Sequence, residues 1–247
     1  MSDKETATRE TGAREPGAIG KALIRFFMRD AKVGNCEHLS NNFHMLGLEG
    51  PELKNVAWKA GEKIQVALGP AFTTRTYTPI EWDRTAGMTR LLVYAHADGP
   101  GSEWVRRAKT GDPCHIFGPR SSLDLQSLPG RTILFGDETS IGLALAYRTA
   151  HGHPPSCVLE ANSSAETLSG LRAAGLTQAR VFERRADDAQ LRAMLGEFDL
   201  ADESATYVLT GKASSVQRLR TLLRGANVPG SRILAKAYWA PGKKGLD

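Results

Sequence analysis

The sequence has little of what metal clusters and disulfide frameworks require. Its 247 residues include only three cysteines, Cys36, Cys114 and Cys157, which lie far apart and form no Cys-x-x-Cys pair. This spacing argues against an iron–sulfur cluster, a zinc site or a disulfide framework, and it favours reduced structural thiols. His151 and His153 lie two residues apart, but no further ligands stand near them, so we expect no metal site there.

Long apolar runs and dense basic blocks are also missing. No run approaches the roughly 20 apolar residues of a membrane helix, so we expect no membrane insertion. The first charged residues are not followed by the apolar stretch of a secretory signal, and we therefore predict a cytoplasmic protein. The net charge of +5 is spread along the chain without interleaved aromatics, so nucleic acid is not an expected partner. A mild positive bias would still attract an anionic small molecule.

The chain divides into three parts by composition. Residues 1–17 are polar and charged, which predicts a disordered tail. Residues 18–127 contain short strand-like segments, most of them with β-branched or aromatic residues, and several are separated by turn residues such as those at 34–35, 50–51 and 69–70. This spacing predicts an antiparallel β barrel. The expected strands are 23–33, 38–48, 62–68, 73–78, 89–95 and 114–117.

Residues 128–247 show a different pattern, in which expected strands alternate with expected helices. This alternation predicts a parallel sheet with helices on its faces, in an α/β domain that binds a nucleotide beyond the carboxyl ends of its strands. No Gly-x-Gly-x-x-Gly fingerprint follows the first strand, so an unspecialised strand-to-helix turn remains an equal interpretation. The expected strands are 132–135, 156–160, 179–183, 206–210 and 232–238, and the expected helices are 141–149, 165–174, 188–198 and 214–224.

The segment from Arg75 to Pro79 is the most informative part of the first domain. Side chains alternate between the two faces of a strand, so Arg75 and Tyr77 would project together while Thr76 points the other way. One face would then offer a cation for phosphate and a flat ring for a heterocycle. Pro79 biases Thr78 toward an extended conformation, which would leave its hydroxyl at the end of the strand.

A glycine-proline turn supplies the second half of this constellation. Gly99-Pro100-Gly101-Ser102 precedes a segment, 103–108, that reads as a short helix. Free amide groups and the dipole at a helix start attract phosphate, and glycines let the backbone approach closely. An ordinary barrel strand followed by a capped helix explains either piece alone, whereas the two together favour a dinucleotide site.

Six motifs occur in the order found in siderophore-interacting proteins, which the chain resembles from about Ile24 to about Gly245. They are RTYT (75–78), HADGPGSEW (96–104), GD (111–112), FGPR (117–120), GDET (136–139) and YWAPGKKG (238–245). The resemblance implies an FAD-dependent, NAD(P)H-linked ferric-siderophore reductase related to the ferredoxin-reductase group. It implies an FAD-binding barrel over 18–127 and an NAD(P)H-binding domain over 128–247.

The resemblance also implies roles for residues of the first domain. Tyr77 would lie against the flavin ring, Thr78 would hydrogen-bond its polar edge, and Arg75 would face the diphosphate. The turn after the fifth expected strand would hold the remaining phosphate oxygens, and several such contacts are needed because each is worth only about 0.3 to 1 kcal/mol. The other residues of the predicted FAD site are Thr76, His96, Asp98, Gly99, Pro100, Gly101, Ser102 and Trp104.

In the second domain the resemblance implies a nicotinamide site. Thr139 would lie where nicotinamide meets flavin, although with Asp137 it could simply cap the following helix. Arg184, together with Arg185, would hold the ribose phosphate of NADPH, the alternative being a solvated loop charge. Trp239 would cover the flavin or contact the iron chelate.

Three lysines are candidates for binding the siderophore. Lys243 and Lys244 could attract an anionic chelate, or they could belong to a tail packed on the surface. Lys212 stands where relatives commonly have glutamate, which inverts a charge at the nucleotide edge. Ile80 stands where many relatives have arginine, so one phosphate or adenine contact is absent.

Two other functions remain open from the sequence. One is a flavoprotein reductase with another electron acceptor, such as a haem protein, a quinone or free flavin. The other is a non-catalytic module that binds a chelate or nucleotide without turnover. No hydrolytic triad or pair of carboxylates stands out, as expected when a flavin carries the chemistry.

Overall fold

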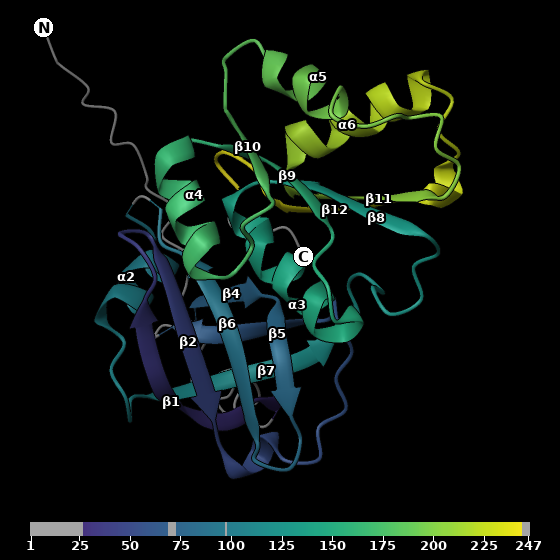
Figure 1. Cartoon of the computed structure of the whole chain (residues 1–247). Helices are drawn as coiled ribbons and strands as arrows, with labels where there is room; N and C mark the ends of the chain where they lie inside the picture. The colour runs from purple at the N-terminus through teal and green to yellow at the C-terminus, as the bar shows by residue number, and fades with distance from the viewer. Residues whose placement is uncertain (1–26, 69–72, 97, 244–247) are drawn as a thin grey trace, which may run out of the picture.

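Two sheets make up the molecule, one antiparallel and one parallel (Figure 1). The computed structural model describes residues 27–68, 73–96 and 98–243. It confirms the predicted combination of an antiparallel barrel with a parallel α/β sheet, and the barrel is a half-barrel. The tail expected to be disordered, the first residues of the expected strand 23–33, the turn at 69–70 and Lys244 lie outside the described residues.

The first sheet has seven antiparallel strands in the order β4-β3-β7-β1-β2-β6-β5. It curves around a core in which Ile64, Val66, Leu91 and Ile116 are fully buried. The strands are β1 (Arg29–His38), β2 (Phe43–Glu49), β3 (Lys63–Leu68), β4 (Thr73–Tyr77), β5 (Pro79–Asp83), β6 (Met88–Tyr94) and β7 (Pro113–Arg120), with a 3-10 turn η1 (Pro51–Leu53) and helix α2 (Pro100–Arg107).

The sheet differs from the prediction in two places. The turn expected at Gly34–Asn35 lies inside β1, where the register with β2 shifts between Val33 and Asn35. Gly47 on β2 makes room for this irregularity, because a Cβ there would lie 1.9 Å from the Asn35 Oδ1. The sequence analysis also missed β5, which resumes directly after Thr78 and pairs with β6.

The second sheet has five parallel strands in the order β10-β9-β8-β11-β12. Helices cover both of its faces, α3 and α4 toward the barrel and α5 and α6 on the far side (Figure 1). The elements are β8 (Arg131–Gly136), η2 (Glu138–Ser140), α3 (Ile141–His151), β9 (Ser156–Ala161), α4 (Ser164–Ala173), β10 (Arg180–Glu183), α5 (Ala189–Leu195), β11 (Ala205–Lys212), α6 (Ala213–Gly225), η3 (Gly230–Arg232) and β12 (Ile233–Trp239).

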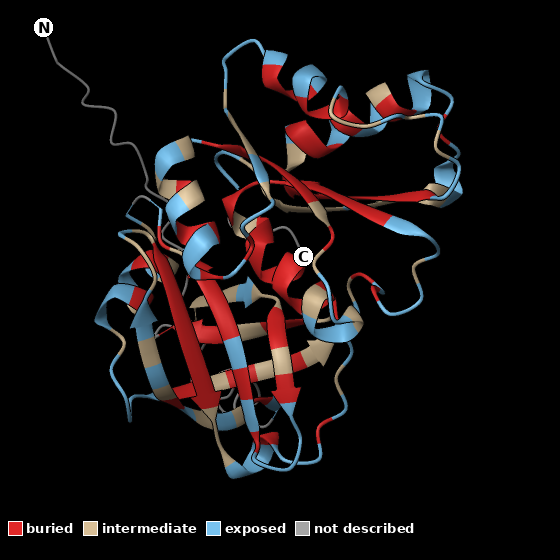
Figure 2. Cartoon of the chain, viewed as in Figure 1, coloured by how far each residue is buried: buried red, intermediate tan, exposed pale blue. Residues whose placement is uncertain are grey.

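One hydrophobic core joins the two sheets. Phe43 and Met45 of β2 pack in the same cluster as residues of α3 and α4, which explains why β2 is buried along nearly its whole length (Figure 2). The packing is close at Gly170 of α4, where a Cβ would lie 2.4 Å from the Phe43 ring. Glu166 of α4 adds polar contacts, since its Oε1 accepts hydrogen bonds from the Ser40 hydroxyl (2.7 Å) and the Asn42 amide (2.9 Å).

Among the described residues, no helix combines the length and the apolar character needed to cross a membrane.

Candidate functional site

The two sequence motifs of the barrel meet at the start of helix α2. Arg75 and Tyr77 lie on β4, opposite Val66 and Ile64 of β3. A Cβ at Gly101 would lie 2.9 Å from the Tyr77 hydroxyl and 3.3 Å from the Arg75 Cγ. The prediction that Arg75 and Tyr77 project to the same side is therefore confirmed, and both flank the glycine-proline turn. We call this surface, formed by Arg75, Tyr77 and residues 99–102, the β4–α2 bed.

The start of α2 is open to an anion. The helix begins at Pro100, three residues earlier than predicted, because proline suits the first helical position. Its N-cap Gly99 is extended (φ −124°, ψ 156°) and provides no side-chain cap, and a Cβ at Gly99 would meet no atom of the described residues within 4 Å. The Ser102 hydroxyl donates to the His96 carbonyl at 2.8 Å, which holds the preceding turn. Uncapped amides at a helix start favour phosphate.

Arg75 supplies a cation beside these amides. Its Nη1 donates to the Thr74 carbonyl at 2.8 Å, and no carboxylate among the described residues pairs with it. The Tyr77 ring packs near the Trp104 ring with centroids 6.1 Å apart. Burial raises the pKa of Tyr77, while Arg75 acts in the opposite direction, so Tyr77 stays a neutral phenol at physiological pH.

The residues present therefore fit a flavin dinucleotide. A guanidinium without a carboxylate partner among the described residues and an uncapped helix start suit the diphosphate, and the Tyr77 ring offers a flat surface for a heterocycle. Of the other predicted residues, Thr76, His96, Asp98 and Pro100 are exposed, while Ser102 is buried.

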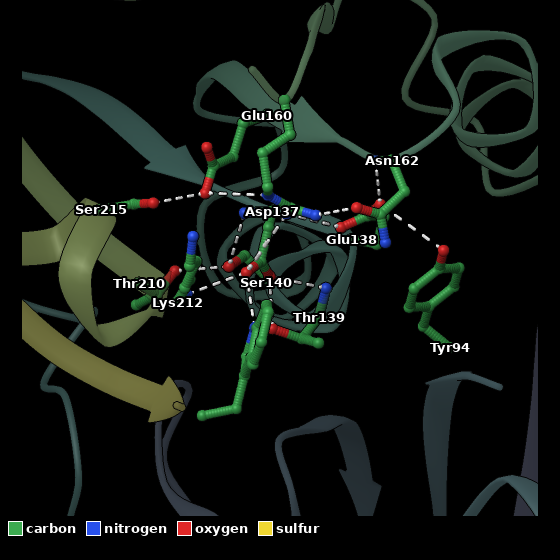
Figure 3. A network of polar contacts seen from close by, with 12 residues as sticks. Tyr94, Asp137, Glu138, Thr139, Ser140, Glu160, Asn162, Thr210, Lys212 and Ser215 are labelled. Carbon is green, nitrogen blue, oxygen red and sulfur yellow. Dashed lines mark hydrogen bonds and ion pairs between the residues drawn. The ribbon is translucent and has the colours of Figure 1, made fainter. Parts of the chain in front are cut away.

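A second polar site lies at the carboxyl ends of the parallel strands (Figure 3). Asp137 follows β8 and is fully buried. Its Oδ1 accepts hydrogen bonds from the Thr139 amide (2.9 Å) and hydroxyl (2.5 Å). Its Oδ2 accepts from the Lys212 amide (2.9 Å) and the Trp239 indole (2.7 Å). Asp137 was expected to cap the helix that follows, but it instead caps the 3-10 turn η2, where it forms a capping box with Ser140, and α3 begins after Ser140 without a side-chain cap.

The Asp137 carboxylate depends on these donors. Burial raises the pKa of Asp137, and the hydrogen bonds from Thr139 and Trp239 oppose this shift. Gly211 allows β11 to pass close by, since a Cβ there would lie 2.5 Å from the carboxylate and the residue has a φ of +101°. The site is thus built by backbone and side chains from β8, β11 and β12.

Arg184 lies at the centre of three buried carboxylates. Its guanidinium is 3.2 Å from Glu138 Oε2, 3.4 Å from Glu160 Oε1 and 4.0 Å from Asp137 Oδ2. It also lies over the Trp239 ring, 5.8 Å from the centroid. The alternative of a solvated loop charge is wrong, because the Arg184 side chain is only 12% exposed. The assignment of Arg184 to the NADPH ribose phosphate stays a prediction.

Sequence reasoning missed most of this network. Glu138 was visible only as part of the GDET motif, and Glu160 only as a residue near the end of a strand. No local pattern could have paired them, because their shared contact with Arg184 depends on the register of three parallel strands. The remaining members are Asn162, Gln190, Thr210 and Ser215.

The two sites adjoin each other. The His96 ring, beside the β4–α2 bed, lies 6.1 Å from the Trp239 ring and stacks on Tyr94 at 5.3 Å. The Tyr94 hydroxyl reaches Glu138 Oε1 at 3.5 Å. Burial, followed by the nearby Glu138 carboxylate, raises the pKa of Tyr94 to about 12. Aromatic rings thus connect the barrel to the carboxyl edge of the parallel sheet.

The predicted lysines make few contacts with the residues of the candidate site. Lys212 is half-buried at the N-cap of α6, and its backbone rather than its side chain contacts Asp137. Lys243 is exposed in the turn after β12, where its amide donates to the Ala240 carbonyl at 3.2 Å. Two cavities of about 330 and 400 Å³ lie elsewhere, on the side of the barrel that carries Glu81 and Arg90.

This arrangement of half-barrel and parallel sheet is the ferredoxin-reductase-like fold. Phthalate dioxygenase reductase, described as a modular structure for electron transfer from pyridine nucleotides to [2Fe-2S], superposes with a TM-score of 0.71 at 15% identity, over 87% of this chain and 70% of that one. The siderophore-interacting protein SipS from Aeromonas hydrophila gives 0.73 at 22% identity (87% and 92%). A siderophore utilization protein from T. fusca gives 0.70 at 18% identity (89% and 95%).

The family follows from two sequence matches. Residues 65–123 match the siderophore-interacting FAD-binding domain, and residues 130–242 match the siderophore-interacting protein domain. The chain belongs to the siderophore-interacting protein family and carries its FAD-binding domain. No curated protein sequence matches it significantly.

Proposed function

We propose that this protein is an FAD-dependent reductase that transfers electrons from NAD(P)H to a ferric siderophore and so releases ferrous iron. The observation that best supports this proposal is the approach of His96 to Trp239, with ring centroids 6.1 Å apart. Through these rings the candidate FAD site meets the carboxyl edge of the parallel sheet, where open α/β sheets bind nucleotides. In this proposal residues 18–127 form the FAD domain and residues 128–247 the NAD(P)H domain.

The residues of the β4–α2 bed would bind and orient the cofactor. Arg75 and the amides at the start of α2 would hold the diphosphate, and Tyr77 would lie against the ring system. When bound, FAD supplies the ability to accept two electrons together and to give them up singly. The protein's own part would be to bind and orient the ring through Tyr77 and Thr78, with Trp239 and Thr139 on the side of the parallel sheet.

The proposed function also requires a site for the electron acceptor. A ferric siderophore would approach from the open side of the bed, and Lys212, Lys243 and Lys244 would favour an anionic chelate. The proposal also places the protein in the cytoplasm, where NAD(P)H is available.

Stepwise reduction and reoxidation test this function. Purified protein reconstituted with FAD is bleached anaerobically with NADH or NADPH in a stopped-flow instrument, and ferric catecholate, hydroxamate and citrate chelates are then added. We expect bleaching by a pyridine nucleotide and rapid reoxidation by at least one ferric siderophore. Bleaching without reoxidation by any iron chelate would indicate another acceptor. Protein that does not bind FAD would be a binding module without turnover.

Two matched arginine variants extend the test to the site. Arg75→Ala should weaken FAD binding about tenfold or more, because a charge-assisted contact to phosphate is lost. Arg90→Ala, on the same barrel but paired with Glu81 at 3.1 Å, should leave FAD binding unchanged. Equal FAD content of both variants after extensive dialysis would contradict the role given to Arg75.

A further inference from the structure

The order of the parallel strands sets the direction in which a bound nucleotide would extend. The barrel reaches the parallel sheet at Trp239, whose ring lies 6.1 Å from the His96 ring. Trp239 ends β12, the outermost strand on that side of the sheet. The nicotinamide has to lie near this contact to reduce a flavin in the barrel. The rest of a nucleotide bound along the carboxyl edge would then extend over β8 and β9 toward β10, which Arg184 and Arg185 directly follow.

The Arg184 guanidinium is already occupied by oxygen atoms of the chain. Its Nη2 lies 3.2 Å from Glu138 Oε2, its Nε lies 3.4 Å from Glu160 Oε1, and its Nη1 donates to Asn162 Oδ1. Each of the three guanidinium nitrogens therefore faces an acceptor. A phosphate could bind Arg184 only by displacing one of these oxygens, and a buried carboxylate that loses its cation is strongly destabilising.

The carboxylates around Arg184 also exceed its charge. Glu138 and Glu160 are both buried, and each carries a formal negative charge against the single positive charge of the guanidinium (Figure 3). Asp137 is a third buried carboxyl group, 4.0 Å from the guanidinium. Buried charges are screened by salt less than exposed ones. A 2′-phosphate near the end of β10 would therefore be repelled, whereas a ribose with a free 2′-hydroxyl adds no charge.

Arg185 is the other cation that follows β10. Its side chain is 68% exposed, and its Nε lies 3.5 Å from Asp187 Oδ1. The same oxygen accepts a hydrogen bond from the Ala189 amide at 3.2 Å, which holds the carboxylate beside Arg185. Arg185 and Asp187 together carry no net charge, so they do not offset the buried carboxylates. Lys212 ends β11, on the other side of β8 from β9 and β10.

We propose that the parallel-sheet domain binds NADH in preference to NADPH, and that Glu138 and Glu160 are the residues that set this preference. This inference rests on the proposed function, since it takes the carboxyl edge of the sheet as the nucleotide site. Arg184 in this proposal holds the two carboxylates in place instead of binding the ribose phosphate of NADPH. The adenosine ribose binds beside them with its 2′-hydroxyl free.

Nucleotide binding tests this inference without turnover. Isothermal titration calorimetry of the FAD-loaded protein with NAD⁺ and with NADP⁺ measures the two dissociation constants. We expect NADP⁺ to bind about tenfold or more weakly than NAD⁺, because its additional phosphate meets uncompensated negative charge. Equal affinities, or tighter binding of NADP⁺, would overturn the inference. Binding of neither nucleotide would instead overturn the proposed function, so the two failures are distinguishable.

The Glu138→Gln variant tests the role of the carboxylates. It removes one negative charge beside Arg184 and keeps an oxygen that can accept from the Asn162 amide, which Glu138 Oε1 binds at 2.7 Å. We expect the ratio of the NADP⁺ to the NAD⁺ dissociation constant to fall about 5- to 10-fold. Asp199→Asn is the matched control, because it removes the same charge before β11, at the amino edge of the sheet. It should leave the ratio unchanged.

Asp187→Asn is a second variant at an exposed position, where folding is not at stake. Its side-chain oxygen can still accept from the Ala189 amide, but Arg185 loses its charged partner. We expect NADP⁺ to bind about 2- to 5-fold more tightly and NAD⁺ to bind as in the wild type. Asp199→Asn is again the control, since Asp199 Oδ1 likewise accepts from the amide two residues on, that of Ala201. Wild-type ratios in both Glu138→Gln and Asp187→Asn would overturn the inference.

Discussion

The indole Nε1 of Trp239 donates a hydrogen bond to Asp137 Oδ2 at 2.7 Å, across 102 positions of sequence. The bond ties the last strand of the parallel sheet to the turn that follows its first strand. Because the acceptor is a buried carboxylate, the bond should contribute more to stability than one between neutral groups.

Replacing Trp239 tests this relationship. We expect Trp239→Phe to lower the free energy of unfolding by about 1.5 to 3 kcal/mol, as for a hydrogen bond to a charged group. The matched control is Trp82→Phe, since the Trp82 indole donates to the neutral Leu53 carbonyl at 3.0 Å. Its loss should be about 0.5 to 1.5 kcal/mol. Urea denaturation of the apoproteins measures both, and equal losses would contradict the special role of Asp137.

Arg184 and Arg185 are adjacent in sequence but should differ sharply in importance. Arg184→Met leaves three buried carboxylates without their shared cation, which should cost about 3 to 5 kcal/mol of unfolding free energy. Arg185 is 68% exposed and pairs with Asp187, so Arg185→Met should change stability by less than about 0.5 kcal/mol. Thermal and urea denaturation at one pH provide the comparison. Similar effects of the two variants would show that the carboxylates do not depend on Arg184.

Gly101 offers a test of the geometry of the bed. Gly101→Ala would place a methyl group 2.9 Å from the Tyr77 hydroxyl, so that side chain must shift. An overpacking cost of about 1 kcal/mol on the FAD-bound state corresponds to about a fivefold rise in the FAD dissociation constant. Gly225→Ala, at the end of α6, meets no described residue within 4 Å and should bind FAD as the wild type does. Unchanged affinity of Gly101→Ala would show that FAD binds away from this contact.

His44 should make stability depend on pH. It is 1% exposed, and both ring nitrogens lack a hydrogen-bond partner among the described residues. Burial, followed by His38 and Arg106, lowers the pKa of His44 below 6.5. Between that lowered pKa and 6.5 the unfolded chain binds a proton that the folded chain does not, so stability is lost as the pH falls.

The measurement for His44 is urea denaturation at several pH values between 7.5 and 5. The contribution of His44 to the slope is at most about 1.4 kcal/mol per pH unit. His44→Leu should flatten the slope, and replacement of exposed His153 by leucine should leave it unchanged. A slope identical in His44→Leu and the wild type would rule out His44 as its source.

Local patterns predicted most of the fold. Alternating residues and turn glycines located nearly every strand, and the change of rhythm after residue 128 located the parallel sheet. The errors arose where distant strands decide the outcome. Asn35 extends β1 because Gly47 faces it, and β5 forms because β6 lies beside it.

The candidate site was likewise predictable only where it depends on local sequence. The proximity of Arg75, Tyr77 and Gly101 followed from short motifs, because strand alternation and a helix start are local features. The partners of Arg184 could not be predicted, since they depend on the register of parallel strands.

Phe43 and Met45 share an apolar cluster with α3 and α4. This shared cluster limits whether the two domains can be expressed as separate fragments. A barrel fragment that ends near residue 127 would expose Phe43 and Met45 of β2 to solvent. The complementary fragment would expose the apolar residues of α3 that pack against them. Large apolar patches that become exposed to solvent in this way promote aggregation. A chimaera that borrows this barrel for another reductase should therefore keep α3 and α4 with it.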